Sequence, residues 1–225
     1  YEKTSSALVK QSIIDVPWLK KMRPSVEAGF HSVLGKYVIH THSVYANILN
    51  CIEGGSEHVE KIFSGKIYKT AVIPYISPGF FLTIKIMEAL SECCKRTGKT
   101  PEVFFLQNHG LIIASDDYRK AVELHSEVNE EIRKYFGITE AFPSVELVNT
   151  NNNIVLSKSS YIKNYLECGD IRPDFFNKVI LYPDQYVYLS GGIGINSDVS
   201  RLNINTLTGE VEYRTGESEA RTMEE

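Results

Sequence analysis

Apolar and polar residues follow two different periods along residues 24–137 of the chain. Short apolar runs, typical of buried strands, occur at residues 36–42, 66–75, 102–108 and 110–115. Between them, apolar residues recur every three or four positions, which is typical of amphipathic helices. The helices predicted in this way cover residues 24–34, 43–55, 56–65, 77–99 and 115–137. This alternation of strands and helices predicts a layered α/β domain.

The pattern changes at about residue 143. The segment "PSVELVNTNNNIVLSKSS" is polar and rich in Asn, and it predicts a loop. After it, "KVILYPDQYVYLSGG", "RLNINTLTG" and "EVEYRTG" are interpreted as short strands with turn signals, and "EARTMEE" as the start of a helix. Without a convincing boundary, we expect a single domain over residues 1–225. Its motifs lie in residues 20–137, and residues 143–225 form an extension that adds strands to the same sheet.

Composition narrows the class of partner. The hydrophobic fraction of 43% is enough for a substantial core, and the net charge of −4 comes from mixed charges without a basic stripe. We therefore expect a small-molecule or protein partner and no nucleic acid. No apolar run approaches the roughly 20 residues that span a bilayer, and the first residues do not resemble a signal peptide, so we expect a cytoplasmic protein without a membrane partner. The four cysteines lack CxxC spacing and are interpreted as reduced, structural thiols.

Three histidines are candidates for a metal site. His40 and His42 are two positions apart on a predicted strand, so their side chains share one face and can reach one ion. This spacing alone is weak, and two polar residues at the end of a strand would explain it too. His109 precedes a Gly between two apolar strands, where an imidazole needs partners. It is either a satisfied core histidine or a third ligand, and three histidines leave a tetrahedral zinc with one open position.

The other charged and titratable candidates allow several roles. Glu27, on the helix before the His40 strand, can be a fourth ligand, a general base or a surface carboxylate. His31 can contact a metal ligand without binding the metal itself. His58 and His125 lie on predicted helices among charged neighbours and are interpreted as solvated surface residues.

Four motifs occur in a fixed order: "PSVEAGFH", "VIHTHS", "IPYISPG" and "FFLQNHGLI", the last followed by the helix "DDYRKAVELHSEVNEEI". In this order they resemble the class II aldolase/adducin family over roughly residues 20 to 137. The resemblance implies a class II aldolase-like fold, a three-layer α/β/α sandwich with a central mainly antiparallel or mixed β-sheet. It also implies a homotetramer with the active site at a subunit interface.

Matched position by position, the resemblance implies roles for individual residues. His40, His42 and His109 look like the three zinc ligands, and Glu27 looks like the catalytic acid/base. Tyr75 resembles a tyrosine that donates a proton across a subunit boundary.

The phosphate end of the substrate matches the family less closely. Ser25 falls where the family binds the substrate phosphate, whereas Val26 stands where family aldolases often have a second serine. The family's Gly-Asn and Ser-Gly loops are not legible before residue 20.

The function implied is that of a zinc-dependent aldolase-type lyase, with Mn²⁺ or Co²⁺ as alternative metals. It would cleave or form a C–C bond in a ketose or ketose phosphate through a zinc-stabilised enediolate. A pentulose-phosphate 4-epimerase or a sugar dehydratase of the same superfamily is an alternative. A non-catalytic adducin-like interaction domain is an alternative of another class, but adducin heads lack the zinc ligands, and all three histidines are present here.

Overall fold

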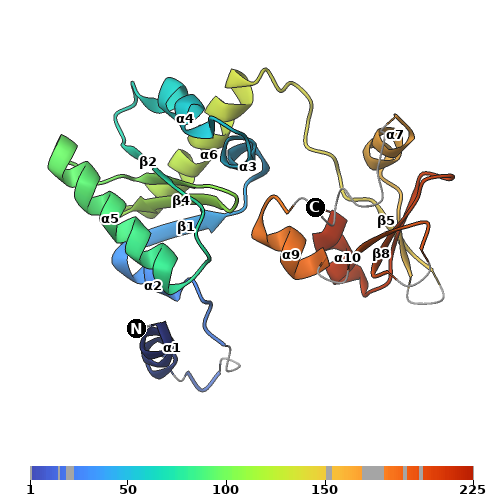
Figure 1. The fold of residues 1–225 in the computed structure, drawn as a ribbon, viewed down its shortest axis with the longest axis horizontal. Coiled ribbons are helices and arrows are strands. Elements are labelled where there is room, and N and C mark those ends of the chain that lie inside the picture. The colour runs from blue at the N-terminus through green and yellow to red at the C-terminus, as the bar shows by residue number, and fades with distance from the viewer. Residues whose placement is uncertain are drawn as a thin grey trace. The chain divides into compact units, whose positions relative to one another are not determined.

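The computed structural model describes residues 2–14, 16–18, 23–150, 154–168, 180–189, 192–197 and 200–224. The sequence pattern predicts one domain, but the chain divides into two compact units, Tyr1–Thr139 and Glu140–Glu225 (Figure 1). Each unit has a sheet and an apolar core of its own.

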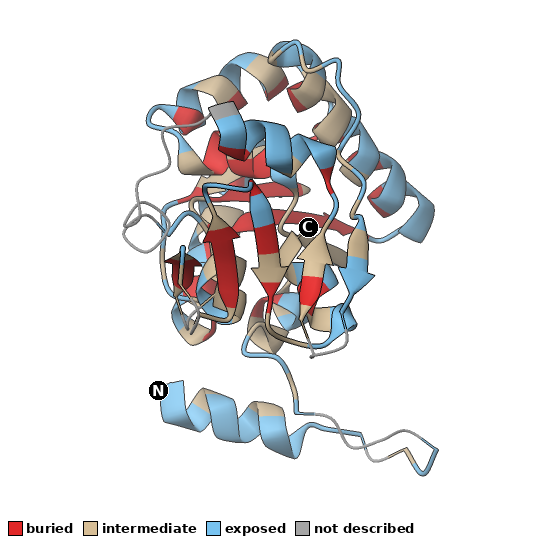
Figure 2. Cartoon of the chain, turned by 90° about the vertical axis from the view of Figure 1, so that its right-hand side faces the viewer, coloured by how far each residue is buried: buried red, intermediate tan, exposed pale blue. Residues whose placement is uncertain are grey.

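The first unit contains every strand and helix expected over residues 24–137, with somewhat shorter bounds. Its elements are α1 (Glu2–Gln11), α2 (Ala28–Val33), β1 (Tyr37–Thr41), α3 (Val44–Cys51), α4 (Gly55–Phe63), β2 (Thr70–Ile73), α5 (Phe80–Thr97), β3 (Val103–Leu106), β4 (Gly110–Ser115) and α6 (Tyr118–Tyr135). Helix α1 has no buried residue, and it is drawn almost entirely in the exposed colour in Figure 2.

The sheet of the first unit has the strand order β1-β4-β3-β2, in which only the β2–β3 pair is parallel. Both central strands, β3 and β4, are buried along their whole length. Successive side chains of a strand point to opposite faces, so Val103 and Phe105 join a core with α3, α4 and α6. Phe104 and Leu106 join a second core with α2 and α5. The helices cover both faces of a mixed sheet (Figure 1), which confirms the predicted α/β/α sandwich.

The register of β1 against β4 brings distant parts of the chain together. His40 is paired with Ile112 and Thr41 with Leu111, so the end of β1 lies beside the start of β4, directly after His109. Val38 packs against the core of α2 and α5. His40, two positions further on, therefore points to the α2 side of the sheet, whereas Thr41 points to the α6 side.

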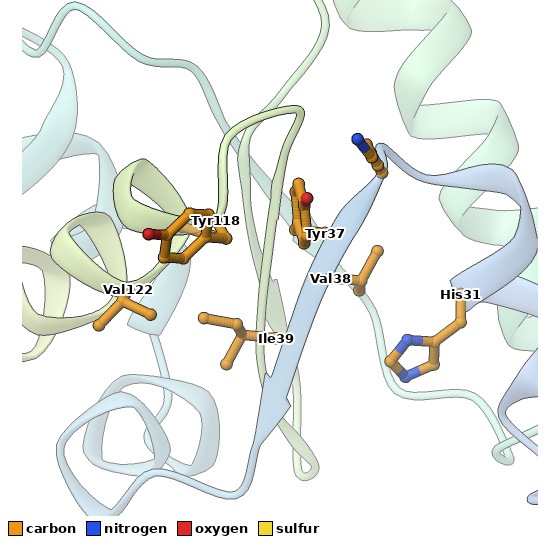
Figure 3. A pocket seen from close by; sticks show the side chains of 8 residues that line it. His31, Tyr37, Val38, Ile39, Tyr118 and Val122 are labelled. Carbon is orange, nitrogen blue, oxygen red and sulfur yellow. The ribbon is translucent and has the colours of Figure 1, made fainter.

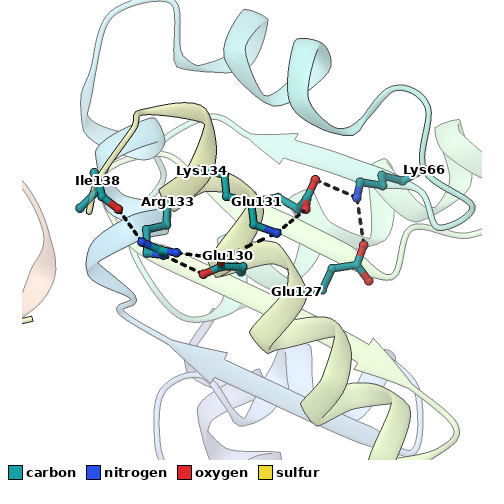
Figure 4. Close-up of polar contacts among 7 residues, drawn as sticks. All are labelled: Lys66, Glu127, Glu130, Glu131, Arg133, Lys134 and Ile138. Atoms are coloured by element: carbon teal, nitrogen blue, oxygen red, sulfur yellow. Dashed lines mark hydrogen bonds and ion pairs between the residues drawn. The ribbon is translucent and has the colours of Figure 1, made fainter. Parts of the chain in front are cut away.

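Ion pairs hold the C-terminal half of α6 in place. Lys66, which follows α4, lies 3.1 Å from Glu127 Oε1 and 2.9 Å from Glu131 Oε2 (Figure 4). Arg133 Nη1 donates a hydrogen bond of 2.6 Å to the carbonyl of Ile138, just beyond the helix. Single exposed ion pairs contribute only about 0–1 kcal/mol each. The network therefore orients α6 more than it stabilises the unit.

The second unit has its own five-stranded sheet, in the order β5-β6-β9-β8-β7. Its elements are β5 (Leu147–Asn149), β6 (Val155–Ser157), α7 (Ser160–Cys168), α9 (Pro183–Leu189), β7 (Ile193–Ile195), β8 (Leu202–Asn205), β9 (Glu210–Tyr213) and α10 (Glu217–Glu224). The expectation that residues 143–225 add strands to the first sheet is therefore wrong. Apolar side chains of these strands instead pack together with Ala220 of α10 in a separate core.

Two further expectations differ from the structure. The Asn-rich segment predicted as a loop contains the antiparallel pair β5–β6. The strand expected over residues 178–192 contains the helix α9 at Pro183–Leu189, and the other described residues, 180–182 and 192, are in neither a strand nor a helix; residues 178–179 and 190–191 lie outside the described residues. Pro183 suits the first helical position, and Gln185 Oε1 accepts a hydrogen bond of 3.0 Å from Leu181 N just before the helix. These local signals favour the helix.

The remaining expectations for this unit are confirmed. β8 and β9 form where "RLNINTLTG" and "EVEYRTG" predict strands, and α10 forms around the predicted terminal helix. In the first unit, Cys51, Cys93 and Cys94 are free thiols; Cys93 is buried, whereas Cys94 is exposed and is not a structural thiol of the core. The side chain of Cys168, in the second unit, lies outside the described residues.

Candidate metal centre

Four side chains of the first unit converge on one point: Glu27, His40, His42 and His109. One potential ligand atom from each lies within 4.8 Å of the others. The three imidazole rings form a nearly regular triangle, with centroids 5.1 Å (His40 to His42), 5.0 Å (His40 to His109) and 5.1 Å (His42 to His109) apart. β1 and the residue after it supply two of the rings, the turn before β4 supplies the third, and the residue before α2 supplies the carboxylate.

His40 has the hydrogen bonding expected of a metal ligand. Its Nδ1 lies 3.0 Å from the carbonyl oxygen of Leu111. Because a carbonyl only accepts, Nδ1 carries the proton and Nε2 presents a lone pair. Among the described residues, His40 Nε2 is buried without a hydrogen-bond partner, and it lies 3.4 Å from Glu27 Oε1. A buried, unsatisfied nitrogen is costly, and a bound cation would satisfy it.

His109 is held in a tight turn between β3 and β4. Its backbone N–H donates to the carbonyl of Leu106 (3.1 Å), and Asn108 has a left-handed backbone with φ of 51°. The side chain is 3% exposed, and its Nε2 lies 3.1 Å from Glu27 Oε1. The turn therefore points a buried imidazole at the carboxylate.

Glu27 is an anion in this environment. Burial raises the pKa of its carboxyl group, but the neighbouring imidazoles of His109 and His40 outweigh this effect and hold the pKa well below its usual range. Three imidazole nitrogens and one carboxylate oxygen form a donor set that suits Zn²⁺, with Mn²⁺ or Co²⁺ as alternatives. The residues present therefore fit a divalent transition metal.

Both neighbours of His42 are tied to α6. Thr41 Oγ1 and His125 Nε2 are hydrogen-bonded at 2.9 Å, and Ser43, the N-cap of α3, is hydrogen-bonded to Asn129. The interpretation of His125 as a solvated surface residue is therefore wrong. It is half-buried, and burial lowers its pKa, which favours the neutral imidazole.

The predictions for His58, His31 and Tyr75 have different outcomes. His58 is half-buried and lies 2.9 Å from the hydroxyl of Tyr135 in a surface hydrogen bond. His31 is exposed and stacks on Phe30 at 4.7 Å between ring centroids, and Phe30 in turn contacts His40. Tyr75 is 60% exposed in the segment between β2 and α5, and its role stays a prediction.

Ser25 has a local structural role beside the site. Its hydroxyl accepts a hydrogen bond of 3.1 Å from the backbone N–H of Glu27, which stabilises the turn before α2. The side chain is exposed, so it remains accessible to a ligand. Phosphate binding by Ser25 also stays a prediction.

A depression of about 390 Å³ lies along the outer edge of β1, the last strand in the order of its sheet. Figure 3 shows it between Tyr118 and Val122 of α6 on one side and His31 of α2 on the other. Its lining residues are His31, Lys36, Tyr37, Val38, Ile39, Tyr118, Ala121 and Val122. It contains none of the four clustered side chains and is a separate feature.

Gly110 is required by the close packing of the rings. A Cβ atom at this position would lie 2.5 Å from Thr41 O, 2.9 Å from His42 Cδ2 and 3.3 Å from His40 Cε1. We expect Gly110→Ala to displace both rings and to weaken zinc binding by about tenfold or more, as changes in groups that orient metal ligands do. Competition with a chromophoric chelator measures the affinity. Gly65→Ala is the control, because a Cβ there meets nothing within 4 Å, and equal zinc affinities of the two variants would contradict the expectation.

Comparison with known proteins gives a family match. The family described as "Class II Aldolase and Adducin N-terminal domain" matches residues 2–136. Separately, none of the described helices combines the length and the apolar character that crossing a membrane requires.

Similar individual proteins cover part of the chain. A 3-oxo-tetronate 4-phosphate decarboxylase of Haemophilus influenzae is 30% identical over 125 residues, which is 51% of this chain and 56% of that protein. The enzyme of the same name from Pectobacterium atrosepticum is 28% identical over 130 residues, 53% of this chain and 56% of its own. The chain thus spans a little more than half the length of these relatives. A solved N-terminal class II aldolase domain from Thermoplasma acidophilum aligns at 23% identity with a TM-score of 0.47, covering 60% of this chain and 58% of the other.

Proposed function

This chain belongs to the class II aldolase and adducin family, and from that premise we propose that it is a metal-dependent carbon–carbon lyase. The substrate class is a polyhydroxylated ketone or keto acid derived from a sugar. The observation that carries the proposal is the convergence of three imidazoles, one buried and two half-buried, with one ionised carboxylate. A non-catalytic interaction domain gains nothing from bringing such a donor set together. The unsatisfied Nε2 of His40 would only lower its stability.

In this proposal His40, His42 and His109 hold the metal and Glu27 moves a proton. The bound cation supplies a Lewis acid that favours the negative charge developing on the substrate's oxygens during bond cleavage. The cleaved bond leaves its electron pair on the carbon next to the carbonyl, as an enediolate. Glu27 is the acid/base of the cluster, and it exchanges the proton on that carbon. The carboxylate oxygen lies 3.1 Å from His109 Nε2, which places it beside the position of the bound ion for this step.

Two leaving fragments are compatible with the same enediolate. We favour carbon dioxide, because the two relatives described above are named decarboxylases of a 3-oxo acid. In a 3-oxo acid the carboxylate leaves from the carbon next to the ketone, and one proton then replaces it. Aldol cleavage releases an aldehyde instead and needs a base for the substrate hydroxyl and an acid for the aldehyde oxygen. Tyr75 is the residue that we propose for that acid, acting across a subunit boundary of a homotetramer.

The substrate's other end is proposed to be a phosphate bound through Ser25. The exposed hydroxyl lies two residues before Glu27, so a phosphate there would place the reacting carbons toward the cluster. Epimerase and dehydratase chemistry would rely on the same metal, and they are the alternatives if the test below gives neither carbon dioxide nor aldehyde.

The test is a substrate panel with the whole chain, loaded in turn with Zn²⁺, Mn²⁺ and Co²⁺. It contains 3-oxo-tetronate 4-phosphate, ketose phosphates and the corresponding unphosphorylated compounds. Released carbon dioxide and aldehyde are measured separately. We expect metal-dependent carbon dioxide release from the phosphorylated 3-oxo acid, with little from its unphosphorylated form. Aldehyde release alone would replace the decarboxylase by the aldolase, and no product from any compound, with a full complement of metal, would reject the lyase.

A further inference from the structure

Asn50 holds the residues on both sides of His109. Its side-chain Nδ2 donates to the carbonyl oxygen of Gly110 at 2.9 Å, and its backbone carbonyl accepts from the N–H of Asn108 at 3.0 Å. The same Nδ2 donates to Asn47 Oδ1 at 3.2 Å. One residue of α3 therefore bonds to the residue before the third histidine and to the residue after it.

The contact is built into the core. Asn50 is 4% exposed and Asn47 8% exposed, on a helix whose other buried residues are Ala46 and Leu49. Burying an amide among apolar side chains lowers the stability of the fold unless the amide makes its hydrogen bonds. Here both protons of Nδ2 are used, and the carbonyl of Gly110 gains a partner.

Helix α3 also begins directly after the segment of β1 and His42 that supplies the other two histidines. Ser43, which follows His42, is the N-cap of α3, and Asn50 is the penultimate residue of that helix. A helix is a rigid rod with a rise of about 1.5 Å per residue. α3 therefore sets the position of the His109 turn relative to His42.

We propose that Asn50 is a positioning residue for the metal site: its side chain keeps His109 at the distance from His40 and His42 at which three imidazoles bind one ion. The inference rests on the proposed function, because it assumes that the cluster binds a metal. It predicts that the amide governs metal affinity and ligand geometry without touching the metal or the substrate.

The experiment compares wild type with Asn50→Leu, which keeps the bulk of the side chain and loses both donors. Asn50→Ser is a second, smaller variant in case the first does not fold. Both keep the backbone bond to Asn108. Circular dichroism establishes that each variant is folded, and competition with a chromophoric chelator gives its zinc affinity. We expect a loss of about tenfold or more, the range typical of groups that orient metal ligands. With Co²⁺ in place of zinc, we expect an altered visible spectrum, because the ligand geometry changes.

The control is Asn203→Leu in the second unit. Asn203 is 5% exposed, and its Oδ1 accepts a hydrogen bond of 2.8 Å from Ser197 N, so it matches Asn50 in burial and in the bond of its side-chain amide to a backbone group. It should lower stability without changing zinc affinity or the cobalt spectrum. A folded Asn50 variant with the wild-type affinity and spectrum would overturn the inference while leaving the lyase proposal intact. Wild-type protein that binds neither metal would overturn both.

Discussion

Replacement of His109 by Ala is expected to abolish metal binding and, with it, all lyase activity. The imidazole is buried and lies at one corner of the triangle of rings, so its loss leaves two imidazoles and one carboxylate. No neighbouring side chain in the described cluster replaces it. Metal content by mass spectrometry should fall from about one ion per chain to almost none after dialysis.

Thermal unfolding separates loss of metal from loss of fold. Zinc at 100 times its dissociation constant should stabilise wild-type protein by about 2.7 kcal/mol, and His109→Ala should gain nothing. The control is His58→Ala, which removes another half-buried, hydrogen-bonded histidine that lies outside the cluster. It should keep its metal and the stabilisation by zinc. A His109→Ala protein that retains one ion per chain would refute the ligand assignment.

Replacement of Glu27 by Gln is expected to separate metal binding from proton transfer. Gln has nearly the same shape as Glu, and the three imidazoles remain, so the metal should stay bound. The amide cannot exchange a proton, so turnover should fall by about 10²–10⁴-fold, the usual contribution of a positioned acid/base. Exchange of the product's proton in D₂O, followed by NMR, should be lost to the same degree.

The matched variant is Glu53→Gln, which removes an exposed carboxylate in the turn between α3 and α4. It should behave as wild type in both assays. If Glu27→Gln binds metal and turns over at the wild-type rate, Glu27 is not the acid/base. If instead it loses the metal, Glu27 acts mainly as a ligand.

Part of the candidate metal centre could be predicted because its signals are local. His40 and His42 share a face in any strand, since strand side chains alternate. His109 stands out because an imidazole between two apolar strands has no reason to be there without partners. The position of β1 beside β4 then follows from packing, and their register brings the turn of His109 to the end of β1.

The supporting contacts could not be predicted from the sequence. His125 looked solvated because its helix neighbours are charged, yet it bonds to Thr41 across the packed interface of α6 and β1. Asn50 was missed altogether. A polar residue on the apolar face of the predicted helix was the available signal, but its partner Gly110 is sixty positions away in the chain.

In the second unit, local sequence patterns predict the structure less well. Its strands are short, and the Asn-rich segment between β5 and β6 carries strong turn signals that concealed both strands. Local signals at Pro183 favoured a helix over the strand suggested by the alternating tyrosines and valine of the same segment. Which sheet a short strand joins depends on the apolar surface that it meets, and that surface exists only in the folded chain.

The sequence by itself therefore determined the layered α/β order of the first unit, because hydrophobic period and strand alternation act over a few residues. The order of its motifs, through the resemblance to a family, indicated the four clustered residues. Tertiary structure alone decided that the later strands form a sheet of their own, that the four side chains meet within 4.8 Å, and that α3 and α6 bond to residues next to them. These features depend on contacts between residues far apart in the chain, which no local pattern specifies.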